Sequence, residues 1–291
     1  MTDLVEIASD GLLAAINPFG AELTHLRDAR RRELMSDADP AFWPHTAPIL
    51  FPVIGVTNGG VVRVDGAEHP MPKHGFARHS TFDVVRHERD RAVFRLGDSE
   101  ETRARYPFAF RLEIDFSLYG TKLAVEARIA NRGDRPMPAQ FGFHPALAWP
   151  LPYGEPRDEH AITFDAEEPE RLLRIAPDGL IAPERRDSPL DGRTLHLDDA
   201  LFTDDALVWD PVRSDKVRYG AAQGPAVEVG FPDTPRLGVW TKPGARFVCI
   251  EPWHGLADPE GYTGELRDKP GAFAVAPGDE KRIGMTVTLA A

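Results

Sequence analysis

Apolar and polar residues alternate along several short stretches of the chain. The clearest case is the pair of runs 111–118 and 122–130, in which every second residue is apolar. These apolar residues are Leu112, Ile114, Phe116, Leu118, Leu123, Val125, Ala127 and Ile129. Because the side chains of a β-strand point alternately to its two faces, this period predicts two strands with one buried face each. Tyr119-Gly120-Thr121 supplies a turn between them, so we expect a hairpin.

Similar short runs occur throughout the chain and indicate an all-β protein. They cover residues 12–16, 82–86, 92–96, 161–164, 207–209, 227–231, 237–241 and 285–289. The 27 prolines and 25 glycines leave few windows long enough for a helix. Many short strands joined by such turns predict a large antiparallel β-sandwich or a barrel. The polar segment 165–195 is the one plausible linker, but the runs on its two sides look alike, so we expect a single domain over residues 1–291.

Composition narrows the classes of partner and compartment. A net charge of −12 argues against nucleic acid and anionic membranes, since both require a basic surface. No run approaches the ~20 apolar residues of a membrane span, and the N-terminus lacks the features of a secretory signal. Cys249 is the only cysteine, which excludes an internal disulfide and fits a reducing cytoplasm. Its apolar neighbours favour a small buried side chain over a nucleophile.

One apolar run, residues 247–255, carries a single carboxylate. Glu251 shares a strand face with Phe247 and Cys249, and both faces of the run look buried, as in an inner strand of a sandwich. Pro252 removes a ladder donor, so we expect Glu251 to lie at the end of the strand. A buried carboxylate needs a partner or a function, so Glu251 is either a structural residue paired with an arginine or a catalytic group.

Two histidines occupy similarly constrained positions. His144 is followed by Pro145 and shares its face with Gly142 and Gln140. The missing side chain of Gly142 predicts open space beside the imidazole, where another molecule could approach. His74 lies on an expected loop between a proline and a glycine. A lone histidine is most often a hydrogen-bonded structural residue, but two histidines and a glutamate in such settings favour a site.

Other chemistries have little support in the sequence. There is no Gly-x-Ser-x-Gly elbow, no glycine-rich phosphate loop before a helix and no Cys/His spacing of a zinc site. Four histidines between residues 69 and 87 lack the i, i+4 spacing of a helical metal site, so we expect no metal there. Trp149 and Trp253 each follow a motif and could stack on a sugar, although aromatic residues in a sandwich are more often core.

Four short motifs follow one another in a specific order. They are Phe51-Pro52-Val53-Ile54-Gly55, His74-Gly75-Phe76-Ala77-Arg78, Gly142-Phe143-His144-Pro145 and Cys249-Ile250-Glu251-Pro252-Trp253, with a weaker match at Asp205-Ala206-Leu207-Val208. In order and spacing they resemble the motifs of the aldose 1-epimerase (galactose mutarotase-like) family, in particular its bacterial LacX-like branch. The resemblance covers nearly the whole chain. It implies a large antiparallel β-sandwich with a sugar cleft on one sheet, in agreement with the alternation.

The resemblance also implies an activity: interconversion of the α and β anomers of a hexose, without a cofactor or a metal. In this family a base removes the proton of the C1 hydroxyl while an acid protonates the ring oxygen, and the ring opens and closes again. By resemblance Glu251 is the base, His144 is the acid and His74 supports the polarised oxygen. Asp205 resembles the family's acidic ligand of sugar hydroxyls, with the adjacent Asp204 as the alternative.

Arg78, Trp253 and Gln140 complete the expected substrate-binding set. Many relatives have an arginine directly after the Phe-Pro-x-x-Gly turn, where this chain has Val56. A valine cannot donate a hydrogen bond, so sugar contacts on that side must come from elsewhere. Arg78 is a candidate phosphate ligand, but the missing arginine and the charge of −12 lead us to expect a neutral aldose rather than its 6-phosphate.

The alternatives are a hexose-6-phosphate 1-epimerase, a non-catalytic sugar-binding protein on the same fold, which Val56 favours, and a glycoside hydrolase. The hydrolase needs two opposed carboxylates, and Glu251 alone is convincingly placed for that role. Ordinary pKa values of about 4.3 for Glu and 6.5 for His already give an ionised base near neutrality. A nearby carboxylate would raise the pKa of His144 and keep it protonated. The expected partner is a monosaccharide, and the oligomeric state stays open.

Overall fold

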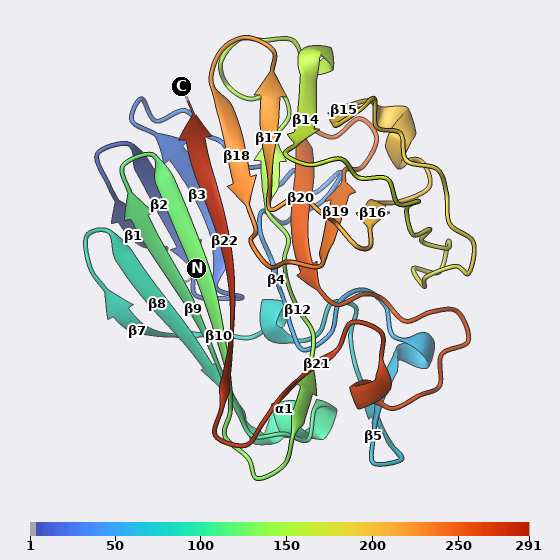
Figure 1. Ribbon diagram of the computed structural model, residues 1–291. Coiled ribbons are helices and arrows are strands. Elements are labelled where there is room, and N and C mark those ends of the chain that lie inside the picture. Colours follow the sequence, from blue (N-terminus) through green and yellow to red (C-terminus); the bar gives the residue numbers. More distant parts are fainter. Residues whose placement is uncertain (1–3, 291) are drawn as a thin grey trace.

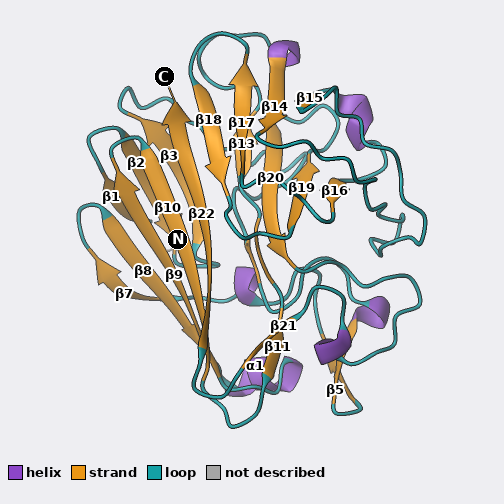
Figure 2. Ribbon diagram, in the orientation of Figure 1, coloured by secondary structure: helices purple, strands orange, loops and turns teal. Residues whose placement is uncertain are grey.

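The computed structural model describes residues 4–290, which form mainly β-strands. Two large antiparallel sheets, of nine and six strands, pack face to face (Figure 1). Figure 2 shows that the helices are few and short. The predicted all-β sandwich is therefore confirmed. No helix in this part of the chain is long and apolar enough to span a membrane.

The nine-stranded sheet draws its strands from most of the chain. They are β7 (Asp83–His87), β8 (Arg91–Gly97), β9 (Phe110–Tyr119), β10 (Lys122–Asn131), β14 (His160–Phe164), β15 (Thr194–His196), β17 (Lys216–Ala221), β18 (Ala226–Gly230) and β22 (Glu280–Ala290). Their order across the sheet is β15-β14-β17-β18-β22-β10-β9-β8-β7.

The six-stranded sheet carries the cavity described below. Its strands are β4 (Ile49–Leu50), β12 (Phe141–Phe143), β13 (Ala146–Ala148), β16 (Leu207–Trp209), β19 (Arg236–Trp240) and β20 (Phe247–His254). The order is β16-β19-β20-β12-β4, and β13 pairs with β20 beyond the end of β12.

Three smaller sheets and a few helical turns complete the fold. The small sheets consist of β1 (Val5–Ala8), β2 (Leu12–Asn17) and β3 (Glu22–Asp28), of β5 (Val61–Val64) and β6 (Ala67–Pro70), and of β11 (Met137–Ala139) and β21 (Phe273–Val275). The helices are α1 (Glu100–Arg105) and the 3-10 turns η1 (Asn58–Gly60), η2 (Ala77–His79), η3 (Arg157–Glu159), η4 (Asp199–Phe202) and η5 (Leu266–Asp268).

Strands β9 and β10 form the expected hairpin. Tyr119 pairs with Lys122, so Gly120 and Thr121 make the turn, and Gly120 adopts the left-handed backbone conformation that glycine tolerates. Every apolar residue that alternates along the two strands is buried in the core between the large sheets. On the opposite face of β9, Asp115 is held by Arg91 and Arg128. The period of two therefore identified the buried face of each strand.

The segment 165–195 does not separate two groups of strands. Strands from before and after it lie in both large sheets. Figure 1 shows this segment, in yellow-green to yellow, on the far side of the six-stranded sheet from the nine-stranded one. Backbone hydrogen bonds attach it there, from Leu173 N–H to the Val208 carbonyl and from Ile181 N–H to the Asp258 carbonyl. These contacts support our proposal that residues 1–291 fold as one domain.

Strand β20 lies between β19 and the β12/β13 pair, and its two faces have different environments. Val248 and Ile250 point into the core between the sheets. Cys249, Glu251 and Trp253 point to the outer face. Both faces are buried, as expected, but the outer face is covered by loops and not by a second sheet.

The expectation that Glu251 ends its strand was wrong. Strand β20 continues through Pro252 to His254, and Pro252 pairs with Leu237 of β19. On the other side, Ile250 N–H donates to the carbonyl of Pro145, which lies between β12 and β13. Residues two apart in a strand direct their amides the same way, so the ring nitrogen of Pro252 also faces this side, opposite Phe143 at the end of β12. Without an N–H at Pro252, the pairing of β12 with β20 ends at Gly142 and Trp253.

The open space expected beside Gly142 is filled. Gly142 pairs with Trp253, and a Cβ atom at Gly142 would lie 2.7 Å from Cδ1 of that indole and 3.1 Å from Cδ1 of Ile54. At Gly238 of β19, a Cβ atom would lie 2.8 Å from the far edge of the same indole. The two glycines on either side of β20 therefore let the Trp253 ring lie close against the sheet.

We predict that Gly142→Ala destabilises the protein by about 1–3 kcal/mol, because the added methyl group overlaps a buried ring that cannot move into solvent. The measurement is the free energy of unfolding in urea. Gly97→Ala in β8 is the matched control, since a Cβ atom there meets no atom within 4 Å. Equal stability of Gly142→Ala and the wild type would show that the indole does not depend on this glycine.

Candidate functional site

A cavity of about 180 Å³ lies over the outer face of the six-stranded sheet. Residues of β20 and β19, of the ends of β12 and β16 and of five loops line it. They are Trp43, Ile54, Gly55, Lys73, His74, Arg78, His144, Ile175, Gly179, Ile181, Asp205, Ala206, Trp240, Glu251, Trp253 and Ala257. Six of the seven residues predicted from the sequence are among them, although they come from four separate parts of the chain.

His144 and Glu251 face each other across adjacent strands. The register between β12 and β20 pairs Gly142 with Trp253, and the register between β13 and β20 pairs Ala146 with Cys249. The two registers are continuous, so the break between β12 and β13 places His144 directly opposite Glu251. Cross-strand neighbours on one face have Cβ atoms about 4.5–5.5 Å apart, within reach of these two side chains.

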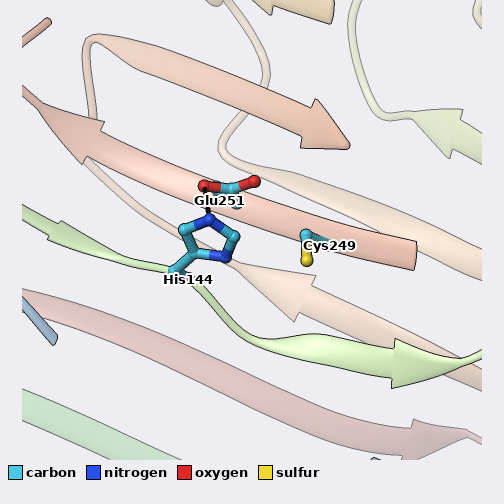
Figure 3. Close-up of side chains that lie close together, drawn as sticks. All are labelled: His144, Cys249 and Glu251. Carbon is cyan, nitrogen blue, oxygen red and sulfur yellow. Dashed lines mark ion pairs between the residues drawn. The ribbon is translucent and has the colours of Figure 1, made fainter. Parts of the chain in front are cut away.

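The two side chains are in direct polar contact within the cavity. Nε2 of His144 lies 3.0 Å from Oε2 of Glu251 (Figure 3). The ring does not direct an N–H at this oxygen, which has no hydrogen-bond partner among the described residues. Both residues are almost fully buried, Glu251 being 1% and His144 7% exposed. An acid and a base are therefore held side by side, with hydrogen-bonding capacity left over.

His74 lies beside His144, with ring centroids 5.7 Å apart and nearly perpendicular ring planes. Its backbone has a φ of 66°, an uncommon conformation for a residue other than glycine. Gly55 holds it there through two hydrogen bonds. The His74 N–H donates to the Gly55 carbonyl at 2.8 Å, and the Gly55 N–H donates to Nδ1 of His74 at 3.1 Å. Because Nδ1 is an acceptor, the proton of the neutral ring is on Nε2.

Two cationic side chains, Lys73 and Arg78, line the same cavity. Within residues 4–290 neither forms an ion pair at 4.0 Å or less. The Nε atom of Arg78 is buried without a hydrogen-bond partner among these residues. The structure therefore leaves both cations free to attract electron-rich groups of a ligand.

Asp205, and not Asp204, faces the cavity. Asp204 is exposed, whereas Asp205 is partly buried and has a φ of 70°. One oxygen of Asp205 accepts a hydrogen bond from the N–H of Ala206 at 2.7 Å. The cavity thus contains a second carboxylate besides Glu251. The number of carboxylates alone therefore does not separate an epimerase from a hydrolase.

Burial favours the uncharged forms of the acid and the base. The pKa of Glu251 is raised well above its ordinary value, mainly by desolvation and then by the negative charge of Asp205, although Lys73 and Arg78 act in the opposite direction. Desolvation lowers the pKa of His144 well below its ordinary value, and Arg78 adds to this effect. The expected rise in the pKa of His144 was wrong, because burial outweighs the nearby carboxylate.

The pKa of His74 is also lowered well below its ordinary value, first by desolvation and then by His144. This agrees with the neutral tautomer that the Gly55 hydrogen bond selects. His74 therefore offers a neutral N–H donor at the end of its ring.

Four buried polar atoms of the cavity residues have no hydrogen-bond partner among the described residues. They are Nε of Arg78, Nδ1 of His144, Oε2 of Glu251 and Nε1 of Trp253. Unsatisfied buried polar atoms are rare in folded proteins, because each costs about 1–3 kcal/mol. Their clustering in one cavity indicates a polar ligand that supplies the missing hydrogen bonds.

Two aromatic residues of the site were missed in the sequence. Trp43 stacks on the His144 ring, with centroids 4.9 Å apart and an angle of 27° between the planes. Trp240 meets the same ring edge-on at 6.0 Å. Trp43 lies in a segment without regular structure and gives no pattern, but Trp240 ends an alternating strand and was open to detection.

The segment 175–181 closes one side of the cavity and was also not predicted as part of the site. It contributes Ile175, Gly179 and Ile181 to the lining. Val56 packs near this segment, since a Cβ atom at Gly179 would lie 2.7 Å from its Cγ2. The wall on the side of Val56 is therefore apolar.

The structure does not bring Gln140 to the cavity. Its side-chain carbonyl accepts a hydrogen bond from Ile54 N–H, and its amide group donates to the Pro270 carbonyl, both at 2.9 Å. Trp149 lies elsewhere as well, with its indole N–H donating to the Arg157 carbonyl. Both side chains stabilise loops around the sheet.

Comparison with known proteins agrees with this geometry. A family model described as aldose 1-epimerase matches residues 3–261. The chain is 28% identical over 295 residues to the plasmid-encoded protein LacX of Lactococcus lactis subsp. lactis, covering 98% of this chain and 99% of that protein.

Two solved structures are similar over almost their full length. One, a galactose mutarotase related enzyme from Lactobacillus acidophilus, has a TM-score of 0.92 and 30% identity, covering 99% of this chain and 97% of the other. The second, a galactose mutarotase-like protein from Lactobacillus casei ATCC 334, has a TM-score of 0.91 and 27% identity, covering 99% and 100%. The match of the family model over most of the chain, together with these relatives, means that the chain belongs to the aldose 1-epimerase family.

Proposed function

We propose that the protein is a mutarotase that interconverts the α and β anomers of a neutral hexose. The observation that carries this proposal is the contact between His144 and Glu251, with 3.0 Å between the acid and the base, in a cavity with unsatisfied polar atoms. A cavity of about 180 Å³ suits a single sugar ring better than an oligosaccharide.

Glu251 accepts the proton of the C1 hydroxyl while His144 donates a proton to the ring oxygen. The electrons of the O1–H bond form the second C1–O1 bond of the aldehyde. The C1–O5 bond breaks, and its electron pair on O5 takes the proton from His144 to give the C5 hydroxyl. After rotation about C1–C2, O5 attacks the other face of the aldehyde and both protons return. The two side chains recover their initial protonation states, so the reaction consumes nothing.

The active form of the pair is the Glu251 carboxylate beside the His144 imidazolium. It contains the same number of protons as the neutral pair that burial favours, so the two forms differ by one proton transfer between groups 3.0 Å apart. Sugar oxygens that hydrogen-bond to both groups stabilise the charged form. His74 then donates its Nε2–H to the sugar oxygen that becomes polarised as the C1–O5 bond breaks, without adding a competing proton.

The other cavity residues orient the ring. Asp205 accepts hydrogen bonds from sugar hydroxyls, and Arg78 donates to them. The indole of Trp253, held against the sheet between two glycines, provides an apolar surface for the C–H face of the sugar. Orientation by fixed groups supplies much of the rate enhancement in reactions of this kind.

The direct test is polarimetry of freshly dissolved α-D-glucose or α-D-galactose with and without the protein. A mutarotase accelerates the approach to the equilibrium rotation. Methyl α-D-glucoside is the matched control, because it has no free C1 hydroxyl and must remain unchanged. Hydrolysis of this glycoside would instead favour the glycoside hydrolase, and sugar binding without acceleration would favour the non-catalytic protein.

We predict that Glu251→Gln and His144→Asn each lower kcat by about 10²–10⁴, the usual contribution of a positioned acid or base. The readout is the rate constant of mutarotation at saturating sugar. His160→Asn is the control, since His160 is also buried but lies in β14 of the other sheet. Near-native rates in both cavity variants would exclude this assignment.

The pH profile of kcat/KM gives a second prediction. Activity requires one proton shared by His144 and Glu251. The raised pKa of Glu251 means that this proton is lost, and activity with it, only at higher pH. Asp205→Asn removes a negative charge that helps to raise this pKa, so the alkaline limit should move to lower pH. Asp204→Asn, which changes the exposed neighbour, should leave the limit unchanged. A limit that stays in place or rises in Asp205→Asn contradicts the electrostatic account.

A hexose-6-phosphate 1-epimerase is the second candidate, because Lys73 and Arg78 both line the cavity and phosphate prefers such groups. Two carboxylates in the same cavity and a net charge of −12 oppose a dianion. We therefore predict a higher kcat/KM for glucose and galactose than for glucose 6-phosphate. A strong preference for the phosphorylated sugar that is lost in Arg78→Ala would reverse this order.

A further inference from the structure

Cys249 has no role in the proposed reaction, yet its thiol lies next to the reacting pair. It precedes Glu251 by two residues on β20, so both side chains point to the same face of the sheet. Donor atoms of His144, Cys249 and Glu251 all lie within 4.8 Å of one another. Figure 3 shows the side chains of His144, Cys249 and Glu251 close together.

We propose that His144, Cys249 and Glu251 form a binding site for a thiophilic divalent cation of the zinc class. A thiolate, a carboxylate and a neutral imidazole are all common zinc ligands, and three protein ligands with one open position are typical of accessible zinc sites. The thiolate and the carboxylate together balance the charge of the ion. The occupied site is therefore neutral, which its nearly complete burial demands.

The geometry suits such an ion. Ligand atoms bound tetrahedrally at ~2.0–2.3 Å lie roughly 3.3–3.8 Å apart. The His144–Glu251 contact of 3.0 Å is close to this range, and the ring does not direct an N–H at the carboxylate oxygen. Two ligand atoms of one metal ion lie close together without a hydrogen bond between them, because each directs a lone pair at the metal. A modest approach of the Cys249 thiol completes the set.

The hydrogen bonding of the pair is compatible with such a site. Oε2 of Glu251 has no hydrogen-bond partner among the described residues, and Nδ1 of His144, which has none either, carries the ring proton when Nε2 binds the ion. His144 and Glu251 also line the cavity, which gives an ion its route from solvent and leaves a fourth coordination position on the cavity side.

The donor set also selects among metals. Mg²⁺ and Ca²⁺ prefer six or more oxygen ligands, which this apolar strand face does not offer. A thiolate with an imidazole favours Zn²⁺, Cd²⁺ and Co²⁺. Binding converts the Cys249 thiol to a thiolate and releases its proton to solvent, so affinity rises with pH.

The ion and the sugar compete for the same side chains. Metal binding occupies the lone pairs that Glu251 and His144 use in the proposed reaction, so zinc should inhibit competitively with sugar. This inhibition rests on the proposed function, whereas metal binding itself does not. The two are therefore measured separately.

The binding experiment is titration of the full chain with Co²⁺, followed by its thiolate-to-cobalt absorption band and by displacement with Zn²⁺. The wild type should give a one-to-one band, and Cys249→Ala should give none. His74→Asn is the matched control, because it changes a cavity imidazole outside the donor group and should keep the band. Circular dichroism checks that each variant is folded, and Cys249→Ser is a second removal of the thiol.

The inhibition experiment follows mutarotation of glucose with and without Zn²⁺. Cys249→Ala should keep its activity. Loss of a residue that only orients a metal ligand already lowers affinity by ~10–100-fold, so loss of the Cys249 ligand should lower the apparent zinc affinity by at least as much. Absence of the cobalt band in the wild type, or equal zinc inhibition of Cys249→Ala and the wild type, overturns the proposal. A band in a protein without mutarotase activity would keep the metal site and reject the proposed function.

Discussion

The site depends on the pairing of one interrupted strand with β20. Strands β12 and β13 pair with β20 in one continuous register, and this pairing is interrupted at His144 and Pro145. An imidazole is thereby held opposite a carboxylate by backbone pairing on both sides of the break, and its position does not rely on a flexible loop. Pro252 fits this arrangement, because its missing N–H faces the end of β12, where the pairing with β20 stops. Two prolines and a constant register thus fix the relative position of the acid and the base.

Burial of this pair has an energetic consequence that the cavity accommodates. A buried ion pair has to offset a desolvation cost of several kcal/mol per ion, whereas a neutral acid–imidazole pair avoids most of it. The raised pKa of Glu251 and the lowered pKa of His144 both express this preference. A polar ligand reverses the balance by supplying hydrogen bonds to atoms that the protein leaves unsatisfied. Ligand binding and formation of the reactive charge state are therefore coupled in this account.

Much of the fold was accessible from the sequence, because alternation of apolar residues reports directly on a half-buried strand. The hairpin of β9 and β10 is the clearest example, and most of the other predicted runs lie in strands. The convergence of His74, His144 and Glu251 in one cavity was predicted as well, from the constrained settings of these residues and the family motifs. Their chemical roles stay proposals.

The remaining features depend on long-range packing, which no local pattern reports. The glycine at position 142 predicted free space, but the indole of Trp253 from the neighbouring strand occupies this space. Trp43 reaches His144 from an irregular segment, and Gln140 turns its amide toward backbone groups far along the chain. The expected rise in the pKa of His144 rested on the nearby carboxylate alone, whereas burial has the larger effect and lowers this pKa. In each case the deciding neighbour is distant in sequence.

The most direct test of the central claim is a structure of the protein with glucose or galactose bound in the cavity. Our account predicts that the C1 hydroxyl lies within about 2.6–3.2 Å of a Glu251 carboxylate oxygen, while the ring oxygen lies within the same distance of the His144 imidazole. A sugar bound outside the cavity, or one in the cavity with its anomeric centre directed away from both residues, would contradict the account.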